Sequence, residues 1–280
     1  DTHTVVALDS ETYYEEGGYS LRNIRPGAYV DDPRFQVHFW TVRRPGDAEA
    51  TVLRTPGEVK DYLAKLRAEA AQSGKPLLLA AHNAAFDARV LNKAYGIELQ
   101  EGERWVDTVS LFRAAAPQSG VTKESPRPSH RLELLAARLR EAGVTGIDEK
   151  DSAANTAASG KRMPWHEGSM EAVTDDELAA FEDYAKNDTS VVLAALDHFD
   201  PSPAFVDLSN AETAIRRGLP GSATGLMAAM GQHGVVPAVG FGKMNDSSRR
   251  MTTAASANNL MPVTLVEGNV PRDVFVYMAA

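Results

Sequence analysis

The sequence predicts an α/β fold in which a mixed β-sheet is flanked by helices. Short apolar runs, which indicate strands, alternate with longer segments whose apolar residues recur at helical spacing. Two strand signals precede the first helix signal, and strands and helices then alternate, as they do in layered α/β domains. This pattern covers residues 1–200, and the composition changes beyond Pro201.

The strand predictions depend on short apolar runs bounded by polar or turn-forming residues. The runs HTVVALDS and KPLLLAAHN indicate buried strands, whereas RFQVHFWTVRR alternates apolar and charged side chains. The predicted strands cover residues 3–10, 34–44 and 75–83 and a short segment around Trp105 and Val106.

Four helices are expected from amphipathic spacing and from signals at their ends. Gly74 and Gly96 close the first two, because glycine adopts the left-handed backbone that often ends a helix. Thr174 and Glu177 have the spacing of a capping box, which places the start of the last helix. The predicted helices cover residues 56–74, 84–96, 131–143 and 174–199.

Three stretches lack a sustained period. Residues 117–130 are rich in Pro and Ser and predict a loop, and residues 143–172 are also expected to be irregular. Residues 201–280 contain many small residues and few charges. We expect them to form a C-terminal extension, linker or small subdomain of unknown role.

The composition excludes several classes of protein. Without cysteine, the 280-residue chain has neither a disulfide scaffold nor a thiolate metal site. No apolar run approaches the roughly 20 residues that cross a bilayer, and no signal peptide begins the sequence. We therefore expect a soluble, cytoplasmic protein with no membrane partner.

The net charge of −9 is concentrated in the first part of the chain. Residues 207–280 contain five acidic and six basic residues, which leaves a net charge of −10 on residues 1–206. This balance disfavours phosphate-bearing partners, because phosphates bind basic surfaces. Divalent cations bound among the acidic residues would nevertheless allow such a protein to bind phosphates.

Two carboxylates follow the first apolar run. Asp9 and Glu11 are separated by one residue, so a strand places both side chains on one face, roughly 7 Å apart. Like charges held together repel one another unless a cation lies between them. A solvated strand end is the simpler interpretation, but in open α/β sheets ligands bind at the strand ends.

Two further segments carry an acid beside polar or aromatic residues. His82 and Asn83 follow a buried strand, and Asp87 lies in the first turns of the next helix, where it could also serve only the helix dipole. Tyr184 and Asp188 are four residues apart on the last helix, so they lie one above the other. Taken alone, Tyr184 is as well explained by packing and His82 by hydrogen bonds within a turn.

The three segments together indicate a metal site. Their four carboxylates offer the hard oxygen ligands that suit Mg²⁺ or Mn²⁺. Two such ions about 4 Å apart can activate a water on one side of a phosphodiester and stabilise the leaving oxygen on the other. The carboxylates are those of Asp9, Glu11, Asp87 and Asp188.

The order Asp-x-Glu, Asn-x-x-Phe-Asp and Tyr-x-x-x-Asp resembles the three motifs of proofreading 3′–5′ exonucleases in the ribonuclease H-like superfamily. The segments DTVSL and GKRMPW, and the stretch that follows the first strand, are similar to the exonuclease domain of bacteriophage family A DNA polymerases. The resemblance covers about residues 3–200. It implies a ribonuclease H-like mixed five-stranded sheet and hydrolysis of single-stranded DNA from its 3′ end to nucleoside 5′-monophosphates.

The resemblance also implies a role for each matching residue. Asp9 would bridge two metal ions, Glu11 and Asp188 would complete the first site, and Asp87 would hold the second ion, partly through water. Tyr184 would orient the attacking water. In the sister branch a histidine five residues before the last acid replaces the tyrosine, but that position is Asp183 here. The residues expected to contact substrate are Thr12, His82, Asn83 and Phe86.

The resemblance further implies partners and a setting. Single-stranded DNA 3′ ends and a DNA polymerase, in cis or in trans, are the expected partners, with phage replication or proofreading in the host cytoplasm as the context. Two other interpretations stay open: an exoribonuclease similar to the ribonuclease D group, and a non-catalytic domain that binds nucleic acid or a polymerase.

Overall fold

The computed structural model describes residues 3–125, 128–149, 152–216, 235–237, 261–267 and 270–276, with side chains described up to Ala214. The chain divides into two units, Asp1–Asp200 and Pro201–Ala280. Among the residues described, no helix has both the length and the apolar character needed to cross a membrane.

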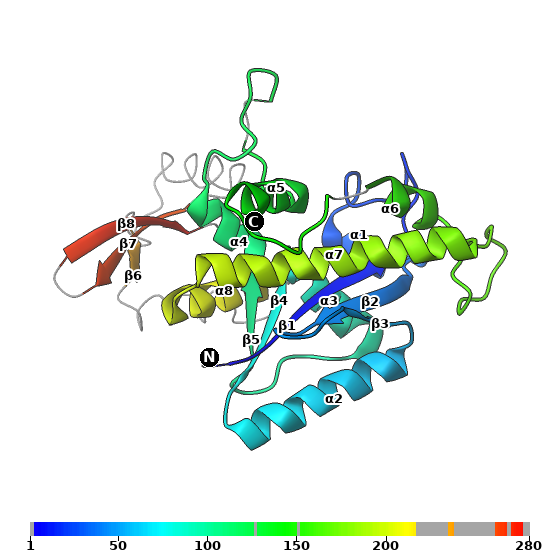
Figure 1. The fold of residues 1–280 in the computed structure, drawn as a ribbon, viewed down its shortest axis with the longest axis horizontal. Helices are drawn as coiled ribbons and strands as arrows, with labels where there is room; N and C mark the ends of the chain where they lie inside the picture. The colour runs from blue at the N-terminus through cyan, green and yellow to red at the C-terminus, as the bar shows by residue number, and fades with distance from the viewer. Residues whose placement is uncertain are drawn as a thin grey trace. The chain divides into compact units, whose positions relative to one another are not determined.

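The first unit is built on a five-stranded mixed sheet with the order β3-β2-β1-β4-β5 (Figure 1). β1 (Thr4–Thr12) lies at its centre, antiparallel to β2 (Val37–Arg43) and parallel to β4 (Leu77–Ala81). β3 (Thr51–Leu53) and β5 (Arg104–Asp107) form the two edges. The predicted α/β class with a mixed sheet is therefore confirmed.

The inner strands are apolar because helices cover both faces of the sheet. All five residues of β4 are buried, which explains its uninterrupted apolar run. Along β1 the side chains of Val6 and Leu8 face the helices α2 (Pro56–Ser73) and α3 (Ala84–Tyr95) in the main core. The pleat then turns Asp9 and Glu11 toward the opposite face.

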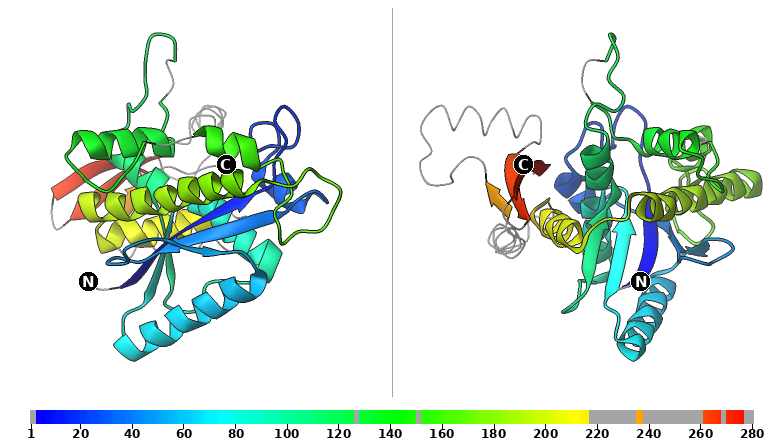
Figure 2. Two further views of the ribbon diagram at one scale, coloured as in Figure 1. Left: turned by 45° about the vertical axis from the view of Figure 1, so that its right-hand side comes forward. Right: turned by 60° about the vertical axis from the view of Figure 1, so that its left-hand side comes forward.

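The longest helix, α7 (Asp175–Phe199), covers that opposite face. Phe181 and Ala185 pack against Phe39 of β2, while Val191 and Ala195 pack against α4 (Thr108–Ala115) and α5 (Leu132–Glu141). Figure 1 and both views of Figure 2 show α7 running beside β1 and β2.

The predicted helix ends are confirmed where capping chemistry marks them. Thr174 and Glu177 form both bonds of a capping box, and α7 begins at the next residue. Gly74 and Gly96 adopt φ angles of 67° and 65° at the ends of α2 and α3. Such angles cost glycine little and other residues more.

The prediction that residues 143–172 are irregular is wrong in part, because α6 (Ser152–Ala158) forms within them. Its sequence SAANTAA has no apolar stripe, so no helical periodicity predicts this helix. Ala158 is buried against the α7 side of the sheet, and a helix this short depends on such packing. β3, α4 and the six-residue α1 (Pro26–Asp31) were also too short to be predicted.

The second unit contains a helix, α8 (Pro203–Arg216), and a three-stranded antiparallel sheet with the order β6-β7-β8. Its strands are β6 (Val235–Pro237), β7 (Met261–Glu267) and β8 (Val270–Val276). The sequence predicted no elements here, because its small residues give no clear helical or strand period.

Candidate metal centre

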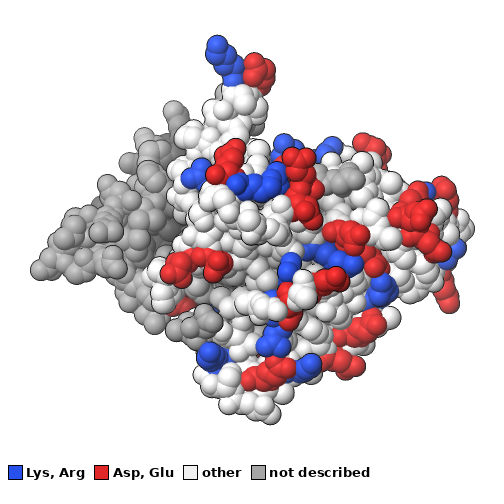
Figure 3. Space-filling model, in the orientation of Figure 1, with Lys and Arg blue, Asp and Glu red and all other residues white. Residues whose placement is uncertain are grey.

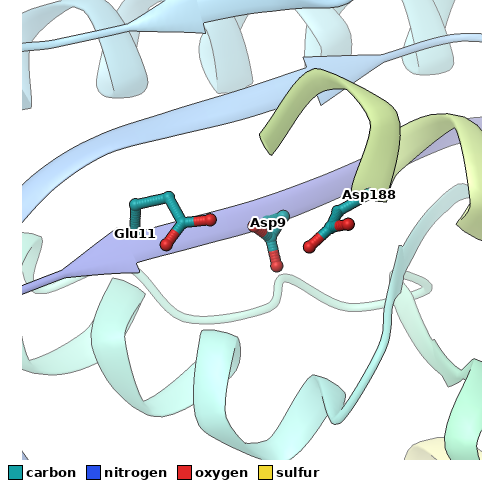
Figure 4. Close-up of side chains that lie close together, drawn as sticks. All are labelled: Asp9, Glu11 and Asp188. Carbon is teal, nitrogen blue, oxygen red and sulfur yellow. The ribbon is translucent and has the colours of Figure 1, made fainter. Parts of the chain in front are cut away.

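Three carboxylates meet where α7 passes the carboxyl end of β1. One carboxylate oxygen from each of Asp9, Glu11 and Asp188 lies within 4.8 Å of the others (Figure 4). Glu11 and Asp188 are buried and Asp9 is half-buried. We call these three residues the acidic cluster. It unites two of the three segments singled out from the sequence.

The sheet register explains how β1 contributes two ligands to the acidic cluster. Asp9 lies opposite Thr41 and Glu11 opposite Phe39 on the antiparallel neighbour β2. Thr41 donates a hydrogen bond from Oγ1 to the carbonyl of Ala185, at 3.0 Å, and thereby ties β2 to α7. The face that carries both acids is therefore the face against which α7 is held.

Hydrogen bonds on both sides of Asp188 fix the rotation of α7 about its axis. Arg43 of β2 donates from Nη1 to the hydroxyl of Ser190. The side chain of Asn187 accepts from the N–H of Asp148 at 3.1 Å and donates to its carbonyl at 3.3 Å. Asp188 lies between these two anchored residues and is held toward β1.

The donor set of the acidic cluster fits a hard divalent cation. Carboxylate oxygens are the ligands that such cations prefer, and a cation among three carboxylates relieves their mutual repulsion. Burial strengthens that repulsion, because the surrounding dielectric is low. Asp9, Glu11 and Asp188 therefore form a group of described residues that could hold a metal ion.

Asp87 lies beside the acidic cluster without belonging to it. Its Oδ1 accepts hydrogen bonds from the N–H and the hydroxyl of Ser10, at 3.1 and 2.7 Å. Burial raises the pKa of Asp87 well above its usual value, and the negative charge of Asp9 raises it further, whereas the Ser10 bonds act in the opposite direction. The expected fourth carboxylate is thus an electrostatic neighbour of Asp9.

Tyr184 lies one helical turn before Asp188, as the spacing predicts. The ring is half-buried and packs with the apolar residues around Phe181. Asn155 of α6 donates from Nδ2 to the hydroxyl of Tyr184 at 3.3 Å. Packing and a hydrogen bond together restrict where the hydroxyl can lie.

Thr12 and Phe86, two of the residues expected to contact substrate, are buried beside Tyr29. The hydroxyl of Tyr29 donates to the carbonyl of Tyr13, so the Thr12 hydroxyl is the donor in its 2.9 Å bond to Tyr29. The rings of Phe86 and Tyr29 are 6.0 Å apart. Both residues thus have a structural role in the core.

His82 and Asn83, the other two residues expected to contact substrate, lie at the junction between β4 and α3. Nε2 of His82 donates to the carbonyl of His130 at 3.0 Å, and Nδ1 pairs with the hydroxyl of Thr108 at 3.0 Å. These bonds support the structural role that the sequence left open for His82. Asn83 adopts a left-handed backbone, with φ 78° and ψ 50°.

Asp107 holds Asn83 in that conformation and was not singled out from the sequence. Its Oδ1 accepts from the N–H of Asn83 at 2.9 Å and from the N–H of Val109, in the first turn of α4, at 2.9 Å. An acid at the end of a buried strand was the available signal, as it was for Asp9. Ser10 and Asn155 gave no such signal, because serine and asparagine occur throughout the chain.

Comparison with known proteins leaves the family open. No protein-family model matches the chain, and no curated protein matches it significantly.

Proposed function

We propose that the chain is a metal-dependent 3′–5′ exonuclease with a ribonuclease H-like fold. It would hydrolyse the phosphodiester bond at the 3′ end of single-stranded DNA and release nucleoside 5′-monophosphates. The observation that carries the proposal is the convergence of Asp9, Glu11 and Asp188 within 4.8 Å from a central strand and a distant helix. The order of the three sequence motifs and the mixed five-stranded sheet also support it.

Mg²⁺ or Mn²⁺ fits the carboxylate ligands best, and two ions suit the chemistry. The acidic cluster would hold the first ion, and Asp9 and Asp87 would hold the second. When bound, the two ions supply a water nucleophile at neutral pH and stabilise the charge on the leaving oxygen.

Tyr184 would orient the nucleophile. A phenol, whose ordinary pKa is about 10, is a poor base at neutral pH, so its hydroxyl acts by hydrogen bonding. The Asn155 contact and the packing of the half-buried ring restrain that hydroxyl, and Tyr184 lies one turn before Asp188 on α7. Correct placement of the water reduces the entropy lost on reaching the transition state.

The surface charge fits a nuclease whose site, rather than its surface, attracts phosphate. On the face shown in Figure 3, acidic and basic side chains of the described residues are interspersed. The first 206 residues carry a net charge of −10. Attraction of a nucleic acid would then depend on the bound cations and on few surface contacts, which predicts a shallow salt dependence of binding.

Digestion of 5′-labelled oligonucleotides tests the proposal. Purified protein is incubated with single-stranded DNA or RNA in Mg²⁺, Mn²⁺ or chelator, beside Asp9→Ala/Glu11→Ala. The control Asp61→Ala/Glu101→Ala removes two exposed acids that lie outside the acidic cluster. We expect metal-dependent shortening of DNA from the 3′ end by the wild type and the control, and none by the Asp9/Glu11 variant.

Each alternative gives a different result in that assay. Preferential digestion of RNA would replace the proposal by an exoribonuclease. Absence of any digestion, with binding of the oligonucleotides retained, would indicate the non-catalytic domain. Activity that survives loss of Asp9 and Glu11 would place the chemistry elsewhere.

A further inference from the structure

Ser10 stands between the two acids of β1 and faces the other side of the sheet. Its N–H and its hydroxyl both donate to Oδ1 of Asp87, at 3.1 and 2.7 Å. Ser10 is 8 % exposed and Asp87 is 2 % exposed, so water has little access to these bonds. Hydrogen bonds to a carboxylate are strong in such surroundings.

The backbone that carries Asp87 is held without Ser10. Asp87 lies in the first turn of α3, and that turn starts at Asn83, whose N–H is bound by Asp107. Ser10 therefore acts on the carboxylate itself. Because both donors meet the same oxygen, they fix the orientation of the Asp87 carboxylate relative to β1 and to Asp9.

We propose that Ser10 is a positioning residue that holds the Asp87 carboxylate ready for a second metal ion beside Asp9. The first ion would be held by the acidic cluster, which contains neither Ser10 nor Asp87. This inference rests on the proposed function only for the use of two ions. It assigns to the central residue of the Asp-x-Glu motif a role in building the site.

Loss of the Ser10 hydroxyl removes the shorter of the two hydrogen bonds and leaves the N–H bond in place. The carboxylate of Asp87 is then less restrained, and its charge beside Asp9 is less well compensated. Residues that orient a metal ligand typically change metal affinity by about 10- to 100-fold when they are removed. We expect the lower end of this range, about tenfold, because one bond remains.

Calorimetric titration of the full chain with Mn²⁺ alone tests the inference without any nuclease assay. We compare the wild type with Ser10→Ala, Ser10→Thr, Asp87→Asn and the Ser10→Ala/Asp87→Asn double variant. We expect two ions to bind the wild type, and the second to bind Ser10→Ala about tenfold more weakly with the first unchanged. Threonine keeps the hydroxyl and should restore the second affinity, and the double variant should match Asp87→Asn.

Ser20→Ala is the matched control, because Ser20 has the same 8 % exposure and lies in the loop after β1. It should bind both ions as the wild type does, and circular dichroism should show that every variant is folded. Equal second affinities in Ser10→Ala and the wild type would overturn the inference. Binding of a single ion by the wild type would overturn it too, while oligonucleotide digestion would still decide the proposed function.

Discussion

Asp9 and Asp107 have the same sequence pattern, an acid near the end of a buried strand, but they have different roles in the structure. Each lies in a buried strand of the parallel part of the sheet, near its carboxyl end. Asp107 accepts two backbone N–H groups and joins β4 to α4. Asp9 lies instead in the acidic cluster with Glu11 and Asp188.

The two acids differ in role because different parts of the chain lie beside the ends of their strands. The N–H groups of Asn83 and Val109 are supplied by the turns that follow β4 and β5, so Asp107 finds its partners locally in the sheet. At Asp9 the neighbour is α7, which brings another carboxylate. An acid at a strand end thus becomes a helix cap or a candidate metal ligand according to the element that passes it.

The largest expected effect is a loss of activity when Asp9, which lies in the acidic cluster, is replaced. Asp9→Asn keeps the shape of the side chain and removes the charge that would hold a cation. We expect the rate of oligonucleotide hydrolysis to fall about a thousandfold, equivalent to about 4 kcal/mol of transition-state stabilisation. Initial rates of hydrolysis of a 5′-labelled strand measure this loss. The control Asp107→Asn should retain most of the activity. If the two variants lost equal activity, Asp9 and Asp107 would not have the different roles described above.

Metal binding should also stabilise the fold through the acidic cluster. At a free Mn²⁺ concentration 100 times its Kd, the free energy of unfolding should rise by about 2.7 kcal/mol. Denaturant unfolding with and without Mn²⁺ measures the change. Asp188→Asn should lose most of it and Asp107→Asn should keep it; stabilisation that persists in Asp188→Asn would place the ion elsewhere.

Removal of the cap at Asp107 should affect stability rather than metal binding. Asp107→Ala leaves the N–H groups of Asn83 and Val109 without their acceptor, which should cost about 2 kcal/mol of unfolding free energy. Urea unfolding in chelator measures this. Asn at the same position retains an acceptor oxygen and should lose less. A folded Asp107→Ala that no longer binds Mn²⁺ would make Asp107 part of the metal site.

A pH dependence of stability is expected from Asp87 in the metal-free protein. The pKa of Asp87 is raised in the folded state by burial and by Asp9, so the folded state keeps a proton that the unfolded state loses. Its contribution to stability is complete below the unfolded pKa near 3.8 and is lost as pH rises through the folded value. Asp87→Asn should therefore gain stability over the wild type with rising pH, in chelator.

Unfolding free energies at several pH values measure this smaller effect. If the unfolding free energies of Asp87→Asn and the wild type differ by the same amount at every pH, burial does not raise the pKa of Asp87.

The parts of the fold that could be predicted depend on neighbours in the sequence. The capping box at Thr174 and Glu177 and the apolar run of β4 act over a few residues, and the structure confirms both. α6 could not be predicted in this way, because SAANTAA has no apolar stripe and is stabilised by packing near α7. Substrate roles for Thr12 and His82 remain predictions, and both side chains form hydrogen bonds within the protein.

By itself the sequence determined that buried strands and amphipathic helices alternate, and that acids follow the first apolar run and mark two helices. Only the tertiary structure decided which acids meet. Asp188 reaches β1 because Thr41 and Arg43 anchor α7 on one face of the sheet. Asp87 turns to Ser10, 77 residues away in the sequence. The reason is physical: local preferences act over a turn or two, whereas a charge is placed by whatever the folded chain packs against it.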